Sequence, residues 1–227
     1  NNGEILSMVS LPDFDPNLSD GEKFNRNTLG LYEFGSVMKT FTVAIGLEEK
    51  KFNINTKYKI DRNIKVGKNK VSDVHSPCKQ EYCSVEDIFS NSSNIGIIKM
   101  IREIGTDKQK KYLYNLGLFD KISLSLPELA TPLIPEPWRE VSTDSISYGY
   151  GISITPLHLA LATSAVLNGG YRIEPSLLKK EEESELKEKI FSNETSEKMR
   201  YLFSKVVTEG TASTAFGYNE RLTYKNS

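Results

Sequence analysis

The stretch Gly35-Ser36-Val37-Met38-Lys39 begins a segment, residues 36–49, that is typical of a buried helix. Apolar residues recur there at helical spacing until Glu48-Glu49-Lys50-Lys51 ends the pattern. Residues three apart on a helix are separated by almost one turn and share a face. The spacing therefore predicts that the Ser36 hydroxyl and the Lys39 amine lie within hydrogen-bond reach of each other.

This pair has the composition of an activated nucleophile. A serine hydroxyl is too weakly acidic to attack a carbonyl unaided, and a desolvated lysine can be neutral enough to take its proton. The free N–H groups of the first helical turn would also stabilise negative charge that forms near Ser36. We therefore predict that Ser36 is a nucleophile and Lys39 its base.

The pattern Ser-x-x-Lys also arises by chance, because both residues are common. Three further examples lie in a Pro/Cys loop, after a proline before a charged run, and inside a charged run, and none of them begins an apolar helix. They are Ser76/Lys79, Ser176/Lys179 and Ser184/Lys187.

The composition describes an ordinary globular chain. The 227 residues include 38% hydrophobic and 26% charged residues, and 29 Lys and Arg balance 30 Asp and Glu for a net charge of -1. This balance argues against nucleic acid or an anionic membrane surface as a partner. No apolar run approaches the roughly 18 residues of a membrane-spanning helix.

The two cysteines, Cys78 and Cys83, are five positions apart in a polar loop. With His75 they offer three ligands, fewer than a structural zinc site needs, so we predict no metal site. A local disulfide in an oxidising compartment and two unrelated free thiols both remain open.

The remaining pattern predicts a mixture of helices and strands. We expect a strand over 4–11, a hairpin of 57–66 with 70–74 around Gly67-Lys68-Asn69, and a helix capped by Ser84 followed by one over 95–104. A helix should begin at Thr106 with Gln109 completing a capping box, another at Thr155-Pro156, and a last one over 195–208. We expect the proline-rich segment 127–137 to be irregular. The segment 145–154 is too rich in glycine for a helix, and the segment 179–189 should be a solvated charged run.

A second polar motif, Ser92-Ser93-Asn94, stands between two apolar helices. A Ser92 hydroxyl there could relay a proton to a leaving amine, and the Asn94 amide offers both a donor and an acceptor to a substrate or to Lys39. The alternative is that these side chains only cap the second helix.

Together the two motifs resemble the first two motifs of the penicillin-recognising serine enzymes. Other stretches, in the same order along nearly the whole chain, are similar to the class B penicillin-binding transpeptidases of the division type. They are residues 3–17, Tyr32-Glu33-Phe34-Gly35-Ser36, Ser93-Asn94-Ile95-Gly96, residues 148–156 and Val207-Thr208-Glu209-Gly210-Thr211.

The resemblance implies an α+β fold of the penicillin-binding transpeptidase and serine β-lactamase type, with helices packed on an antiparallel sheet. It implies a D-alanyl-D-alanine transpeptidase that cross-links peptidoglycan at cell division, is acylated by β-lactams and needs no cofactor. In that reading Ser36 attacks the penultimate D-alanine, Lys39 takes its proton, Ser92 passes a proton to the departing D-alanine, and Asn94 holds the acyl chain.

One element of the family pattern is missing. The third motif, Lys-Thr-Gly or Lys-Ser-Gly, is absent from the 227 residues. We therefore expect residues 1–227 to be a transpeptidase domain that is incomplete at its C-terminal end and lacks its last strands, with an N-terminal anchor and pedestal domain outside this sequence. The resemblance also implies the periplasmic face of the inner membrane, stem peptides and β-lactams as ligands, and division proteins including a glycosyltransferase as partners. Because the periplasm is oxidising, it further implies a disulfide between Cys78 and Cys83.

Two other functions share the nucleophile. A class A β-lactamase would need a deacylating glutamate in a Glu-x-x-Leu-Asn pattern, which Leu126-Pro127-Glu128-Leu129-Ala130 does not match. A non-enzymatic β-lactam sensor has only to stay acylated, and the similarity outside the motifs argues against it. Binding of stem peptides without turnover would favour the sensor.

Overall fold

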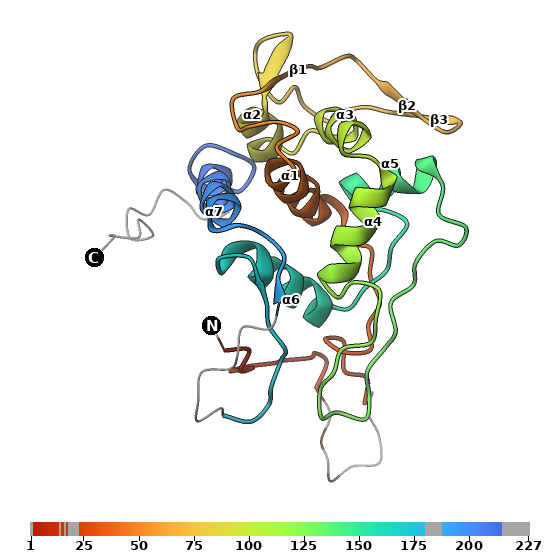
Figure 1. Ribbon diagram of the computed structural model, residues 1–227. Coiled ribbons are helices and arrows are strands. Elements are labelled where there is room, and N and C mark those ends of the chain that lie inside the picture. The colour runs from red at the N-terminus through yellow and green to blue at the C-terminus, as the bar shows by residue number, and fades with distance from the viewer. Residues whose placement is uncertain (1, 14, 16, 18–22, 180–187, 215–227) are drawn as a thin grey trace.

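The chain forms an α+β fold built mainly of helices (Figure 1). The computed structural model describes residues 2–13, 15, 17, 23–179 and 188–214. The helices are η1 (Gly35–Met38, a 3-10 helix), α1 (Lys39–Glu48), α2 (Val85–Ser90), α3 (Asn94–Ile104), α4 (Thr106–Asn115), α5 (Glu140–Tyr148), α6 (Pro156–Leu167) and α7 (Asn193–Thr208). The strands are β1 (Lys57–Lys59), β2 (Ile64–Val66), β3 (Asn69–Val71), β4 (Tyr82–Ser84), β5 (Tyr171–Arg172) and β6 (Glu188–Lys189).

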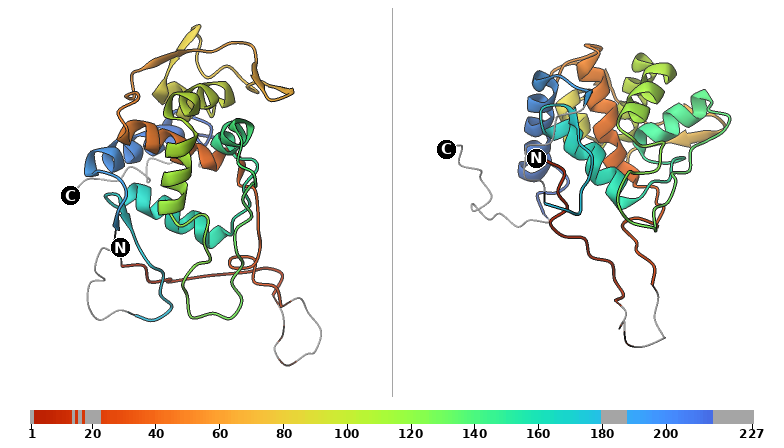
Figure 2. Two further views of the ribbon diagram at one scale, coloured as in Figure 1. Left: turned by 45° about the vertical axis from the view of Figure 1, so that its right-hand side comes forward. Right: turned by 60° about the horizontal axis from the view of Figure 1, so that its bottom comes forward.

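Helix α1 is the centre of the molecule. It contacts α2, α3, α4, α5, α6 and α7, and Figures 1 and 2 show these helices arranged around it. Every residue from Lys39 to Leu47 is buried. A helix that is apolar on nearly all sides is stable only inside a core, which explains why α1 is surrounded. The prediction of a buried helix after Ser36 is confirmed.

The acidic residues at the end of α1 are held by neighbouring helices. Glu48 accepts hydrogen bonds from the Ser192 backbone N–H at 2.9 Å and from the Thr195 hydroxyl at 2.5 Å, at the start of α7. Glu49 accepts one from the Tyr112 hydroxyl of α4 at 2.9 Å. A carboxylate is unfavourable at the C-terminus of its own helix and favourable at the N-terminus of another. The cap of α7 therefore gives Glu48 a stabilising environment.

The strands form three small antiparallel pairs in the described part of the chain: β1 with β4, β2 with β3, and β5 with β6. The predicted hairpin around Gly67 is confirmed as β2–β3, but it is shorter than expected. Residues Lys57–Lys59 pair instead with β4, Tyr82–Ser84.

The expected strand over 4–11 is not formed. Glu4 makes one parallel bridge to Ser176, and the Ile5 N–H donates to the Ser176 carbonyl at 2.8 Å. Beyond it, Leu6 and Val9 are 92% and 70% exposed. Alternating apolar residues predict a strand only if another strand is available to pair with them, and among the described residues this segment has only that one bridge.

Helix caps follow the sequence signals at two of three predicted positions. The Ser84 hydroxyl accepts from the Asp87 N–H and the Asp87 carboxylate accepts from the Ser84 N–H, which is a capping box. Thr155 accepts from the His158 N–H at 3.3 Å. The prediction of a capping box at Thr106 is wrong. The Thr106 hydroxyl bonds instead to the Thr143 hydroxyl of α5, and the Gln109 amide donates to the Thr143 carbonyl.

The glycine-rich segment 145–154 is partly helical, contrary to the prediction. Helix α5 continues to Tyr148 and ends at Gly149, whose φ of 118° is left-handed. The two glycines of this segment, Gly149 and Gly151, both lie after Tyr148. They therefore do not weaken the helix, and Gly149 ends it. The proline-rich stretch over 127–137 is irregular, as predicted.

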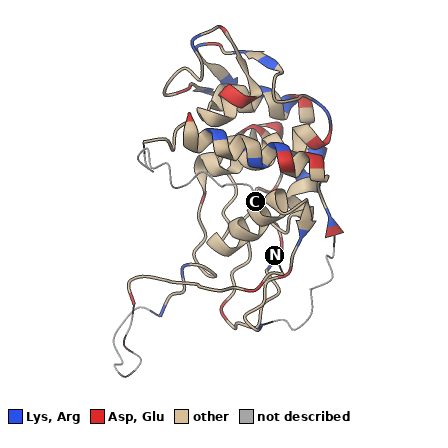
Figure 3. Cartoon of the chain, turned by 90° about the vertical axis from the view of Figure 1, so that its left-hand side faces the viewer, with Lys and Arg blue, Asp and Glu red and all other residues tan. Residues whose placement is uncertain are grey.

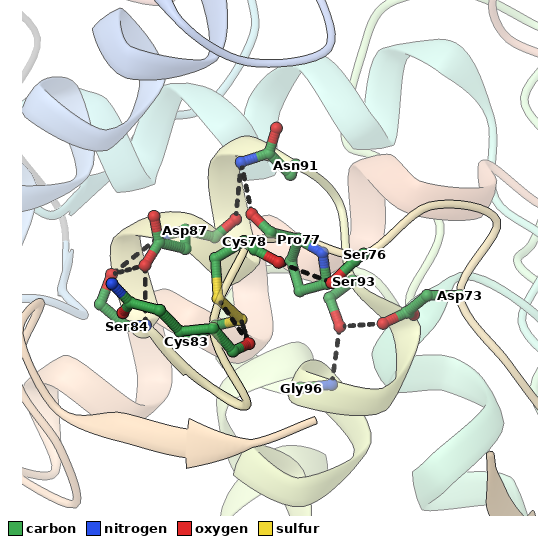
Figure 4. The surroundings of a disulfide bond; sticks show 11 residues. Asp73, Ser76, Pro77, Cys78, Cys83, Ser84, Asp87, Asn91, Ser93 and Gly96 are labelled. Atoms are coloured by element: carbon green, nitrogen blue, oxygen red, sulfur yellow. Dashed lines mark hydrogen bonds between the residues drawn. A yellow bond between two sulfur atoms is a disulfide. The ribbon is translucent and has the colours of Figure 1, made fainter. Parts of the chain in front are cut away.

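Cys78 and Cys83 form a disulfide bond (Figure 4). The disulfide that the resemblance implied is therefore confirmed. It ties the loop before β4 to that strand, and Cys83 is fully buried. Both thiols are used in the bond, so neither is available to a metal.

Charges of both signs are interspersed over the helices and neither sign gathers on the face that Figure 3 shows. This agrees with the balanced composition. None of the helices in the described residues is both long and apolar enough to cross a bilayer. The charged run over 179–189 lies mostly outside the described residues.

Candidate active site

The structure brings Lys39 and Ser92 into direct contact although 53 positions separate them in the sequence. The Lys39 amine donates to the Ser92 carbonyl at 2.6 Å and lies 2.9 Å from the Ser92 hydroxyl. Lys39 is 2% exposed. The buried Lys39 amine and the half-buried Ser92 therefore form one polar unit between α1 and the turn that precedes α3.

Burial changes the proton affinity of this lysine. Desolvation lowers the pKa of Lys39 from 10.5 to about 8, and the nearby Asp73 carboxylate acts in the opposite direction. Burial penalises the charged form of an amine, and a negative charge favours it. Because desolvation dominates, a substantial fraction of Lys39 is neutral just above neutral pH, as a general base requires.

Ser36 lies at the start of the helix, on a short 3-10 turn that leads into α1. Residues Gly35–Met38 form η1, and the Lys39 N–H bonds to the Ser36 and Val37 carbonyls. Ser36 is exposed while Lys39, three residues later, is buried. The helix therefore presents a solvent-accessible hydroxyl one turn before an amine that is shielded from water.

The chain that leads into Ser36, residues 32–35, is held in place by a second segment, residues 149–154. Tyr32 and Ile154 exchange two backbone hydrogen bonds, at 2.9 and 3.1 Å. The Gly151 N–H donates to the Glu33 carboxylate at 2.6 Å, and the Gly35 N–H donates to the Gly149 carbonyl at 3.1 Å. These bonds pair the chain before the nucleophile with the end of α5.

Gly149 allows this pairing because it has no side chain. A Cβ there would collide with the backbone of Gly35, the residue before Ser36. Both glycines also have a positive φ, 118° and 57°. The glycines therefore let two backbones meet where a larger residue would push the nucleophile turn away.

The Ser92 turn has an unusual backbone and is anchored by the residue that follows it. Ser92 has a φ of 58°, which is uncommon for a residue other than glycine. Ser93 caps α3 by accepting from the Gly96 N–H at 3.0 Å. Its hydroxyl also donates to the Asp73 carboxylate at 2.6 Å. The capping alternative is thus correct for Ser93, while Ser92 faces Lys39.

Asp73 is a site residue that the sequence did not reveal. Its carboxylate accepts from the Ser93 hydroxyl and from the N–H groups of Asn94 at 2.5 Å and Ile95 at 3.1 Å. A carboxylate is favourable at a helix N-terminus. The only sequence signal is one acidic residue in a polar loop, 20 positions before Ser93, and such residues are too common to single out.

Asn94 begins α3, two residues after Ser92, and is half-buried. Its side-chain amide lies 3.4 Å from the Ser72 carbonyl, a weak contact. The amide is therefore held only loosely by the protein.

A cavity of about 760 Å³ lies elsewhere, between α3, α5 and the β2–β3 hairpin. The Arg102 guanidinium and the Asp144 carboxylate form an ion pair at 2.7 Å on its wall. None of Ser36, Lys39, Ser92 and Asn94 lines this cavity, so the candidate site is defined by its side chains rather than by this pocket.

Comparisons with known proteins point to one family. The profile of the penicillin binding protein transpeptidase domain matches residues 1–225. A probable peptidoglycan D,D-transpeptidase FtsI of Caulobacter vibrioides is 37% identical over 172 residues, which cover 74% of this chain and 29% of that protein. Stage V sporulation protein D of Bacillus subtilis is 32% identical, over 95% of this chain and 36% of that protein.

The fold leads to the same family. The transpeptidase domain of penicillin-binding protein 3 from Burkholderia pseudomallei superposes with a TM-score of 0.83 at 26% identity, over 94% of this chain and 62% of that one. The chain spans about a third of the length of the two curated relatives, 29% and 36%. Because the family profile covers nearly every residue and the fold agrees, the chain belongs to the penicillin-binding protein transpeptidase domain family.

Proposed function

We propose that the protein is a serine-type peptidoglycan D,D-transpeptidase that cross-links stem peptides during cell division and is acylated by β-lactams. The observation that carries the proposal is the buried Lys39 amine, in contact with Ser92 and one helical turn from Ser36. One of the relatives supports the substrate class: the FtsI of Caulobacter vibrioides is described as a probable peptidoglycan D,D-transpeptidase.

In the first half-reaction, the Ser36 oxygen attacks the carbonyl carbon of the penultimate D-alanine, and neutral Lys39 accepts the Ser36 proton. When the tetrahedral intermediate collapses, the peptide C–N bond breaks. The proton moves from Lys39 through the Ser92 hydroxyl to the departing D-alanine amine. This leaves an acyl-Ser36 ester and free D-alanine, with Lys39 neutral again.

In the second half-reaction, an amine from a neighbouring stem peptide attacks the ester. Its proton returns through Ser92 and Lys39 to the Ser36 oxygen, which leaves as the cross-link forms. The loosely held Asn94 amide is available to bond to the acyl chain. We further propose that this chemistry takes place at the periplasmic face of the inner membrane, beside division proteins that include a glycosyltransferase.

The test is to incubate the intact protein with benzylpenicillin and locate the adduct by peptide mass spectrometry. We expect a stable penicilloyl adduct on Ser36, and a cross-linked product when a D-Ala-D-Ala stem peptide and an amine acceptor are supplied. Acylation without any peptide product would support a sensor. Rapid release of hydrolysed penicillin would support a β-lactamase, and an adduct on another serine would contradict the assignment.

Gly149→Ala should slow acylation of Ser36 by about 100-fold, because the added Cβ displaces the turn before the nucleophile and a shift of about 1 Å is enough for such a loss. The measurement is the second-order rate constant with a fluorescent penicillin. Gly105→Ala is the matched control, since Gly105 also has a positive φ, 91°, but has open space around it and lies between α3 and α4. Equal rates in both variants would contradict the role of Gly149.

A further inference from the structure

One loop holds nearly the whole turn around Ser92. Residues 72–77 bond to the four residues that flank this serine. The bonds run from the Asn91 amide to the Pro77 carbonyl at 3.0 Å, from the Ser93 hydroxyl and the Asn94 and Ile95 N–H groups to Asp73, and from the Asn94 amide to the Ser72 carbonyl. We call residues 72–77 the anchor loop; Figure 4 shows its contacts with Asn91 and Ser93.

The turn needs this support because its backbone is strained. Ser92 has a φ of 58°, a conformation that non-glycine residues hold only when the surrounding structure imposes it. Ser92 itself bonds to Lys39 through both its carbonyl and its hydroxyl. If the turn relaxed, both contacts with Lys39 would lengthen or break.

The anchor loop is itself fixed at its end by the disulfide. Cys78 follows Pro77 directly and is bonded to Cys83 of β4, which is fully buried and pairs with Tyr58 of β1. The next residue, Ser84, caps α2. The covalent bond therefore connects a mostly exposed loop to a buried residue of β4 (Figure 4).

We propose that the Cys78–Cys83 disulfide is a positioning element of the active site, which keeps the anchor loop in place and so holds Ser92 against Lys39. This inference rests on the proposed function, because it is read out through acylation of Ser36. It assigns to the bridge a role in the proton relay beyond general stability.

The experiment compares the intact protein before and after reduction with a dithiol reagent. The reagent gives up two electrons and two protons and becomes its own disulfide, and Cys78 and Cys83 become two thiols. Iodoacetamide then blocks them, and a parallel sample is reoxidised without blocking. The double variant Cys78→Ser, Cys83→Ser is the matched control, because the reagent cannot act on this bridge there.

Reduction should lower the acylation rate constant per labelled molecule at least about tenfold, since the relay depends on accurate placement. The midpoint of the pH–rate profile should rise by about one unit, because water that reaches Lys39 raises its pKa. Reoxidation should restore both values. The double variant should be slow from the start and unaffected by the reagent. Asn91→Ala, which keeps the bridge and loses the bond to Pro77, should show a smaller change in the same direction.

An unchanged rate constant and pH profile after complete reduction would overturn the proposal. A fall only in the number of molecules that can be labelled, with rate and profile unchanged, would also overturn it, because that outcome means general destabilisation. If the untreated protein is not acylated at Ser36 at all, the proposed function fails instead, so the two failures are distinguishable.

Discussion

Ser36→Ala should abolish acylation of the intact protein by a fluorescent penicillin, with a rate constant at least about 10⁴-fold lower. The reason is that no covalent intermediate can form without the hydroxyl, and loss of a nucleophile removes the effect of its base as well. Stopped-flow or gel-based labelling measures the rate. Circular dichroism should show an unchanged fold, because Ser36 is exposed on the η1 turn.

The chain offers a matched control at a second Ser-x-x-Lys sequence. Ser176 is also followed by lysine three positions later, but among the described residues its hydroxyl bonds only to the backbone of Leu178. Ser176→Ala should therefore label at the rate of the unmodified protein. Persistent labelling of Ser36→Ala would contradict the assignment and direct attention to another serine.

Lys39→Ala should reduce the acylation rate about 10²–10⁴-fold, the usual contribution of a positioned general base. In the unmodified protein the rate should rise about tenfold per pH unit up to a midpoint near 8, the lowered pKa of Lys39, and then level off. The sign follows from the mechanism, because the neutral amine is the active form and deprotonation proceeds as the pH rises. Rate constants between pH 6 and pH 10 measure the profile.

Lys99→Ala is the control for this experiment. Lys99 lies on α3 and forms an ion pair with Asp61 at 2.6 Å. Its loss should leave both the acylation rate and the midpoint of the pH profile unchanged. A profile of the unmodified protein that still rises above pH 9.5 would mean that Lys39 keeps its ordinary pKa. Full acylation by Lys39→Ala would exclude it as the base.

Local sequence patterns were sufficient for features that depend on neighbouring residues. The helix after Ser36, the place of Lys39 one turn later, the caps at Ser84 and Thr155 and the hairpin turn at Gly67 were all predictable. Each depends on spacing or on a side chain that bonds within a few positions. The spacing of Cys78 and Cys83 left their oxidation state open, and the disulfide was predicted only through the oxidising compartment that the resemblance implies.

Features that depend on distant partners required the tertiary structure. The segment over 4–11 has strand-like alternation, yet a strand also needs a neighbour that supplies hydrogen bonds. Thr106 has the sequence pattern of a helix cap, but its hydroxyl forms a hydrogen bond with Thr143 on the neighbouring helix α5. The contact of Lys39 with Ser92, the burial that lowers the Lys39 pKa and the role of Asp73 also arise only when remote segments meet. The sequence thus determined which groups can do the chemistry, and the packing of α1 against α3 and the anchor loop decided their geometry and charge, because desolvation and hydrogen-bond distance are properties of the assembled core.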